Sequence, residues 1–166
     1  MKIKKWHISG TVFTIIFGSV LHFVYEWSGF YPLFGLVGSV NESVWEHLKL
    51  LFWPFLISFV VELWAYGKDI PGFFASKAMG IFSGMFFIAS AFYTYTGIIG
   101  TNFALVDISL FVLGAIIAYY LSYKYIKHTL KNAKTADLIG MAVLFLFAVM
   151  FCMFTFNPPG LGIFKP

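Results

Sequence analysis

The chain has 166 residues, of which 60% are apolar or aromatic and only 11% are charged. Its mean hydropathy of +0.87 excludes an ordinary soluble domain, because polar residues are too few to cover so much apolar surface. All 11 basic residues are lysine, and without the bidentate fork of arginine we expect no nucleic-acid partner.

Five segments are long and apolar enough to cross a membrane as helices. A helix needs about 20 such residues to span a hydrocarbon core of about 30 Å. The expected spans are 8–25, 44–66, 79–98, 103–123 and 138–156. The sequence contains no internal repeat and no soluble linker. It therefore predicts an all-α, polytopic bundle of five transmembrane helices, with residues 1–166 forming one integral membrane domain in the lipid bilayer.

The lysines are distributed unevenly between the two sides of this arrangement. Two of them, Lys49 and Lys165, fall on the side opposite the N-terminus. Nine share the N-terminal side, namely Lys2, Lys4, Lys5, Lys68, Lys77, Lys124, Lys127, Lys131 and Lys134. By the positive-inside rule the N-terminus is cytoplasmic and the C-terminus is extracytoplasmic. We expect a multi-pass protein of the bacterial plasma or inner membrane.

Small residues at four-residue spacing predict close packing between helices. Gly80 and Gly84 form such a step in the third span, and Gly114 and Ala118 form one in the fourth.

Acidic residues and two histidines gather at the opposite, outer ends of the spans. They are His22, Glu26, Glu42, Glu46, His47 and Asp107. Ionisable groups at membrane depth are costly and mark functional sites. His22 and Glu26 stand at i and i+4, on one helix face, as a pair of metal ligands or a hydrogen-bonded pair requires.

The second span adds further candidates. Successive helical residues point about 100° apart, so a shared site takes Glu46 or His47, but not both, together with the first span. We expect the loop 27–43 to fold over this cluster. Histidine with carboxylate is compatible with Zn, Mn or Fe, so a divalent metal is a candidate cofactor. The candidate metal ligands are His22, Glu26, Glu42, Glu46 and His47, and the candidate catalytic residues are His22, Glu26, Glu46 and His47.

Structural roles compete with these functional ones. Ser43 and Glu46 fit a capping box, in which the serine caps the helix and the glutamate returns to the capping N–H. Glu46 can also pair with Lys49, which we interpret as the counter-ion of the outer acids. Glu42 suits a helix N-terminus by the dipole argument alone.

Two further residues of the second span have predicted structural roles. Pro54 removes a backbone hydrogen bond and frees the carbonyl of Leu50, which suggests a kink that faces other helices or a cavity. Glu62 is expected to extend toward the inner interface beside Trp64.

Three stretches carry a resemblance to a known family. His22–Gly29, Asn41–Lys49 and the tail Phe156–Pro159 resemble a family of small bacterial polytopic membrane proteins of unknown function. The similarity extends in outline over the whole chain. In that family the double proline is usually followed by His, and later by Pro-Leu-Phe and Asp-Pro, whereas this chain has Gly160 and Gly162. The resemblance implies a membrane location and a shared outer-face motif, but no reaction.

Three classes of function follow from the outer cluster. It could bind a metal or act as acid and base in an intramembrane enzyme, or carry protons or a small ligand in a transporter. The alternative is an accessory subunit, with a membrane-protein partner or a second copy of the chain, in which the cluster only fastens helices. No established catalytic motif decides among them.

Overall fold

The structure is a computed structural model that describes residues 3–127 and 132–166. Over these residues it is entirely helical, and five helices are long and apolar enough to cross a membrane. They are α1 (Ile3–Trp27), α3 (Val44–Ala65), α4 (Phe73–Ile99), α5 (Ala104–Ile126) and α6 (Ala133–Phe156). The shorter elements are α2 (Pro32–Gly35), η1 (Gly67–Asp69) and η2 (Gly162–Phe164). The expected set of five apolar helices is confirmed.

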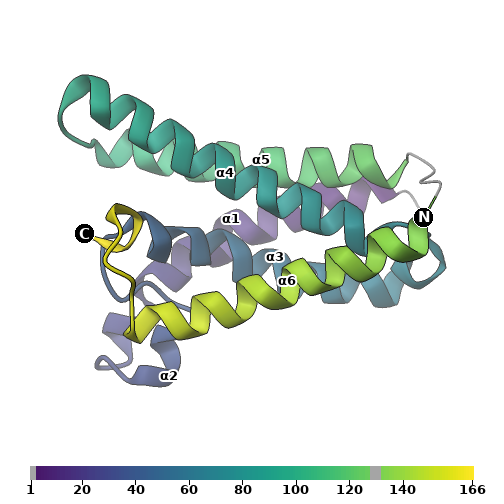
Figure 1. Ribbon diagram of the computed structural model, residues 1–166, viewed down its shortest axis with the longest axis horizontal. Helices are drawn as coiled ribbons and strands as arrows, with labels where there is room; N and C mark the ends of the chain where they lie inside the picture. The colour runs from purple at the N-terminus through teal and green to yellow at the C-terminus, as the bar shows by residue number, and fades with distance from the viewer. Residues whose placement is uncertain (1–2, 128–131) are drawn as a thin grey trace.

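The five long helices run alternately up and down the bundle, and the two chain ends lie at opposite ends of it (Figure 1). The end where α1 stops and α3 starts is called here the His22 end, and the other the His7 end. Helix α1 packs on α3 and α5, whereas α4 packs on α5, α6 and α3. Which end faces the cytoplasm stays a prediction, and Lys2 and Lys131, two of the lysines behind it, lie outside the described residues.

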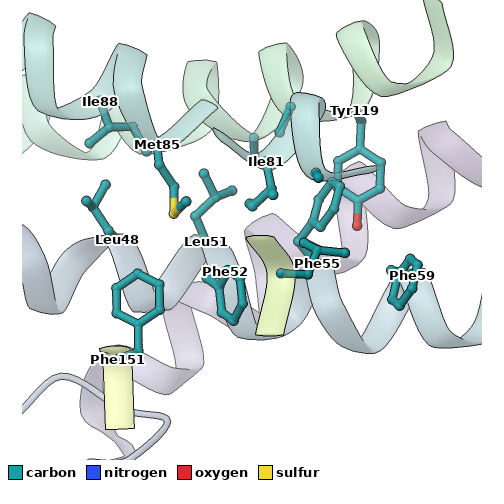
Figure 2. Packing of buried hydrophobic residues seen from close by; sticks show 14 of the residues in the cluster. Leu48, Leu51, Phe52, Phe55, Phe59, Ile81, Met85, Ile88, Tyr119 and Phe151 are labelled. Carbon is teal, nitrogen blue, oxygen red and sulfur yellow. The ribbon is translucent and has the colours of Figure 1, made fainter. Parts of the chain in front are cut away.

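Helix α3 supplies much of the apolar core. Its buried residues face α4, α5 and α6 (Figure 2). The labelled side chains of α3 are Leu48, Leu51, Phe52, Phe55 and Phe59, and their labelled neighbours from the other three helices are Ile81, Met85, Ile88, Tyr119 and Phe151. Helices α1, α5 and α6 instead keep many large apolar side chains exposed. Such exposure is costly in water and favourable against lipid, so these faces are suited to contact the bilayer.

The predicted small-residue steps lie where α4 crosses α5. A Cβ atom added to Gly80 would lie 2.4 Å from the carbonyl oxygen of Ala118, and one added to Gly84 would lie 2.6 Å from that of Gly114. Real Cβ atoms do not approach so closely. Both glycines are therefore required for the observed distance between the two backbones, and the expected close packing is confirmed.

Pro54 lies inside α3, and its effect reaches α1. Because proline has no N–H, the carbonyl of Leu50 lacks its usual helical donor. A Cβ atom on Gly18 of α1 would lie 2.4 Å from that oxygen. The freed carbonyl therefore faces a neighbouring helix, and only glycine fits against it. The expected kink at Pro54 stays a prediction.

Helix α4 begins six residues before the predicted third span. Asp137 of α6 accepts hydrogen bonds from the backbone N–H groups of Gly72 and Ala75, at 2.8 and 3.1 Å, and so caps the first turn of α4. This extension corrects the prediction for Lys77. We expected a loop lysine, but Lys77 lies within α4 and is fully buried.

Candidate functional site

Three side chains from two helices and a loop converge at the His22 end. His22 lies near the end of α1, His47 in the first turn of α3, and Glu42 in the loop just before α3. Oε2 of Glu42 is 3.7 Å from Nε2 of His22 and 3.4 Å from Nε2 of His47. One ligand atom from each residue lies within 4.8 Å of the other two. We call His22, Glu42 and His47 the outer triad.

The spacing of the outer triad suits a single metal ion. Donor atoms about 2.1 Å from one ion, at the tetrahedral angle, lie about 3.4 Å apart. The two measured separations from Glu42 are close to this value. Two histidines and one carboxylate are also the protein ligands of many catalytic zinc sites and of non-haem iron sites.

A hydrogen bond to the backbone orients the His47 ring and leaves its Nε2 free to act as a ligand. Its Nδ1 lies 2.9 Å from the carbonyl oxygen of Ser43, which can only accept. Nδ1 must therefore carry the proton when the ring is neutral, so that Nε2 keeps a lone pair toward Glu42.

The loop that carries Glu42 is held by polar contacts of its own. Ser39 Oγ donates to the carbonyl of Asn41 at 2.6 Å, and the amide of Ser43 donates to Oδ1 of Asn41 at 2.9 Å. These bonds fix the turn that brings Glu42 to the histidines. The carboxylate itself is well exposed, at 70% for the side chain, against 31% for His22 and 34% for His47. An ion could therefore enter from solvent.

The outer triad lies on the wall of a cavity of about 500 Å³ between α1, α3, α4 and α5. Its remaining polar lining residues are Ser19, Asn102 and Asp107. Most of the wall is apolar, and is formed by Phe23, Val44, Leu50, Ile88, Phe92, Ala104, Ile108, Leu110 and Phe111 with Gly18.

Glu46 points away from the outer triad, into the protein. Its carboxylate lies 2.6 Å from Nζ of Lys49, and both side chains are buried. It also accepts a 2.9 Å hydrogen bond from the amide of Val40. Lys49 in turn donates to the carbonyl of Gly35 and to Thr155 of α6, both at 2.8 Å. The expected Glu46–Lys49 pair is confirmed, and it fastens the loop 27–43 and α6 to α3.

The capping box is half formed. Ser43 Oγ accepts from the amide of Glu46 at 3.4 Å, as predicted. The reciprocal bond is missing, because the amide of Ser43 is already bonded to Asn41 and the Glu46 carboxylate is bonded to Lys49.

Glu26 lies beside the outer triad without joining it. It is exposed, and it lines a smaller cavity of about 170 Å³ together with His22 and Glu42. Within the described residues it forms no ion pair or side-chain hydrogen bond. The carboxylate nearest His22 is that of Glu42, which comes from the loop and not from the i+4 position of α1.

A second polar group is buried at the His7 end, where the sequence led us to expect none. Glu62 is fully buried and accepts from both Lys77 and Tyr66. Lys77 also lies 3.3 Å from Nε2 of His7, whose Nδ1 lies 3.1 Å from the carbonyl oxygen of Ile3. The prediction that Glu62 extends toward the interface is wrong, because the buried charge of Lys77 holds it inside the bundle.

Further hydroxyl groups continue this buried group across the bundle. Ser58 donates to Glu62 at 3.4 Å, and Tyr119 and Thr14 are hydrogen-bonded at 2.9 Å. Ser122 lies 3.4 Å from Nε2 of His7. Side chains from α1, α3, α4 and α5 thus satisfy one another where water is scarce.

A family model described as "Family of unknown function (DUF6512)" matches residues 1–166. The chain belongs to the DUF6512 family. No curated protein and no solved structure matches it. Membership in a family of unknown function agrees with the resemblance noted in the sequence, and it assigns this DUF6512 protein no reaction.

Sequence reasoning missed the residues at the His7 end of this DUF6512 protein for an identifiable reason. Ser58 and Glu62 stand at i and i+4 in α3, which is a detectable signal of a polar stripe. Their partner Lys77 was assigned to a loop, and His7 stands close to the N-terminal lysines. A third helix beginning at Phe73 would have placed Lys77 one turn inside the bundle, opposite that stripe.

Proposed function

We propose that this integral membrane protein binds a divalent transition-metal ion through the outer triad. The observation that carries the proposal is that Oε2 of Glu42 lies 3.7 Å from Nε2 of His22 and 3.4 Å from Nε2 of His47, with one ligand atom of each residue within 4.8 Å of the other two. The backbone bond that orients His47 supports it. Zn²⁺, Mn²⁺ and Fe²⁺ are all compatible with this donor set.

Three protein ligands leave at least one coordination position free. The cavity shares all three residues with the outer triad, so we place the free position on the cavity side. A metal ion held in this way can polarise an oxygen of a bound molecule or acidify a bound water. In the orientation predicted from the lysines, this chemistry faces the extracytoplasmic side of a bacterial cell membrane.

Metal titration of the purified protein tests the proposal. We expect one Zn²⁺ per chain, measured by calorimetry in an uncharged detergent and by elemental analysis after dialysis. His47→Ala and Glu42→Ala should each weaken binding by about 10-fold or more, because each removes one of three ligands. Binding should also weaken as the pH falls, since protons compete for the imidazoles.

Glu26→Gln is the matched control for this titration. It removes a carboxylate that lines the neighbouring cavity but lies outside the outer triad. We expect unchanged zinc affinity. Equal loss in Glu26→Gln and Glu42→Ala, or no binding by the unmodified chain, would contradict the proposed site.

An accessory or structural role is the second candidate function. It is favoured by two buried ion pairs that lie outside the lining of the large cavity. Glu62–Lys77 joins α3 to α4, and Lys49, paired with Glu46 in α3, also donates to Thr155 of α6. In that role the protein would act by contact with a membrane-protein partner or with a second copy of itself. Substitutions in the outer triad would then change stability and leave metal content at the background level.

A further inference from the structure

The large cavity offers two chemical environments to one ligand. At one side lies the outer triad, with the proposed open metal position. The rest of the wall is mainly apolar and comes from all four surrounding helices, with Leu50, Ile88, Phe92 and Phe111 among its members. A molecule that filled the cavity would place a polar group at the metal and an apolar body beside these side chains.

The cavity volume restricts the size of such a molecule. At about 500 Å³ it lies within the range of about 300–1,000 Å³ typical of sites for one small ligand. Because this end of the bundle adjoins the bilayer in the proposed location, molecules with an apolar chain are the most concentrated candidates. The volume favours one chain over the two chains of a membrane phospholipid.

Charge determines which polar group the site accepts. Two carboxylates, Glu42 and Asp107, line the cavity, and no lysine of residues 3–127 or 132–166 does. Asp107 is held at the wall by hydrogen bonds from Tyr95 and Asn102. Without a metal, these two carboxylates disfavour an anionic head group. A bound divalent cation offsets the two carboxylates and gives an anionic oxygen an open coordination position.

We propose that the cavity binds a single-chain anionic amphiphile, a fatty carboxylate, whose head group completes the coordination of the metal at the outer triad. This proposal rests on the proposed metal site and adds the class of ligand. It requires that the carboxylate and the metal bind cooperatively. Because coupling between two ligands is reciprocal, each must raise the affinity for the other by the same factor.

Equilibrium binding of radiolabelled palmitate to the purified full chain in an uncharged detergent tests the proposal. We expect one palmitate per chain, bound about 10-fold or more tightly with Zn²⁺ than with a chelator, a typical coupling factor. Palmitate should raise the zinc affinity by the same factor. Hexadecanol, which has the same chain and no charge, should bind more weakly and without regard to zinc. Palmitate binding to His47→Ala in the presence of Zn²⁺ gives the zinc–palmitate association that does not involve the site.

Two substitutions fill the cavity without removing a proposed ligand. Ser19→Trp adds bulk from α1, and Ala104→Trp adds it from α5, which supplies none of the outer triad. Both should weaken palmitate binding about 10-fold while zinc binding by Ala104→Trp stays unchanged. Ser109→Trp is the matched control, because Ser109 is also an exposed helical serine bonded to its own i−4 carbonyl but lies outside the cavity lining.

The outcomes separate this proposal from the metal site. If zinc binds at the outer triad but palmitate binds equally well with chelator, or no better than hexadecanol, the amphiphile proposal is overturned and the metal site stands. If zinc does not bind the unmodified chain, both proposals fail. Palmitate binding that survives Ala104→Trp with full affinity would also overturn the assignment to this cavity.

Discussion

Lys77 and Glu62 carry opposite charges in the buried interior of the bundle, where neither reaches solvent. Removing a charged group from water is costly, and the mutual attraction of the two residues offsets that cost only while both are present. Tyr66 and His7 occupy other hydrogen-bonding positions of the pair. The stability of this region should therefore depend on the pair being complete more than on either residue alone.

Lys77→Met is expected to destabilise the protein by about 3 to 5 kcal/mol, because it leaves the Glu62 carboxylate buried without its cation. The double substitution Lys77→Met with Glu62→Leu should recover most of this loss, since it removes both charges. Unfolding in mixed micelles, followed by circular dichroism, measures the effect. Lys134→Met, at an exposed lysine of α6, is the control and should change stability little. A double variant less stable than the single one would contradict this account.

The residues of the outer triad were all candidates from the sequence, and a site that joins the first span to either Glu46 or His47 was expected, but the position of Glu42 between the two histidines was not. Charge and position at the span ends identified His22, Glu42 and His47 among the candidate ligands. Helical spacing then favoured Glu26 as the partner of His22, because only contacts within one helix can be read from spacing. Glu42 reaches the histidines through the turn of residues 39–43, whose conformation depends on side-chain bonds of Ser39 and Asn41. Such bonds leave no periodic pattern in the sequence from which they could be predicted.

At the scale of elements, α4 and α5 form a hairpin whose packing depends on small residues. Gly80 and Gly84 lie against the backbone of α5, whereas Gly97, later in α4, has no atom near the position of a Cβ. One helix thus contains both a tight and an open glycine. The comparison separates the cost of a larger side chain at the interface from the general effect of replacing glycine in a helix.

Gly80→Val should lower stability by about 1 to 3 kcal/mol, the usual cost of overpacking, because its Cβ would meet the Ala118 carbonyl and Ser122. Gly97→Val, which introduces the same branched side chain into open space, should have a much smaller effect. Thermal unfolding of the two variants in the same detergent provides the measurement. Similar losses in both would show that the α4–α5 contact is looser than described here.

The existence of the five long helices could be predicted from hydropathy alone, because membrane thickness sets their minimum length. Five of their ten ends agree with the prediction to within one residue, namely both ends of α3, the last residues of α4 and α6 and the first residue of α5, but the other five do not. Helix α4 starts at Phe73 because Asp137, far along the chain in α6, caps it, and this contact exists only after the bundle has assembled. The burial of Lys77 follows from that early start. Pro54 and the glycine steps were readable from the sequence because their effects are local to one or two backbones.

At the scale of the whole molecule, the uneven distribution of the lysines predicts the orientation of the protein in the membrane. Burial of Lys49 and Lys77 removes one lysine from each side of the count, so the asymmetry between the two sides persists. If all five candidate helices cross the membrane, the two chain ends lie on opposite sides. The predicted orientation then puts the outer triad and the C-terminus on the extracytoplasmic side.

Reporter fusions test this orientation. A periplasmic reporter such as alkaline phosphatase fused after Pro166 should be active, and the same reporter inserted between Lys127 and Lys134 should be inactive. A cytoplasmic reporter should give the reverse pattern at both positions. If the two positions report the same side, the five-span arrangement is wrong. If each position reports the side opposite to the one expected, the predicted orientation is wrong.

In the proposed metal site, His22, Glu42 and His47 together hold one metal ion. X-ray absorption at the zinc edge of the zinc-loaded protein tests it most directly, because imidazole ligands produce a distinctive outer-shell scattering pattern. The account predicts two imidazole nitrogens at about 2.0–2.1 Å with oxygen ligands in the remaining positions, and one imidazole fewer in His47→Ala. A spectrum without imidazole scattering, or with sulfur from Cys152 in the first shell, would contradict it.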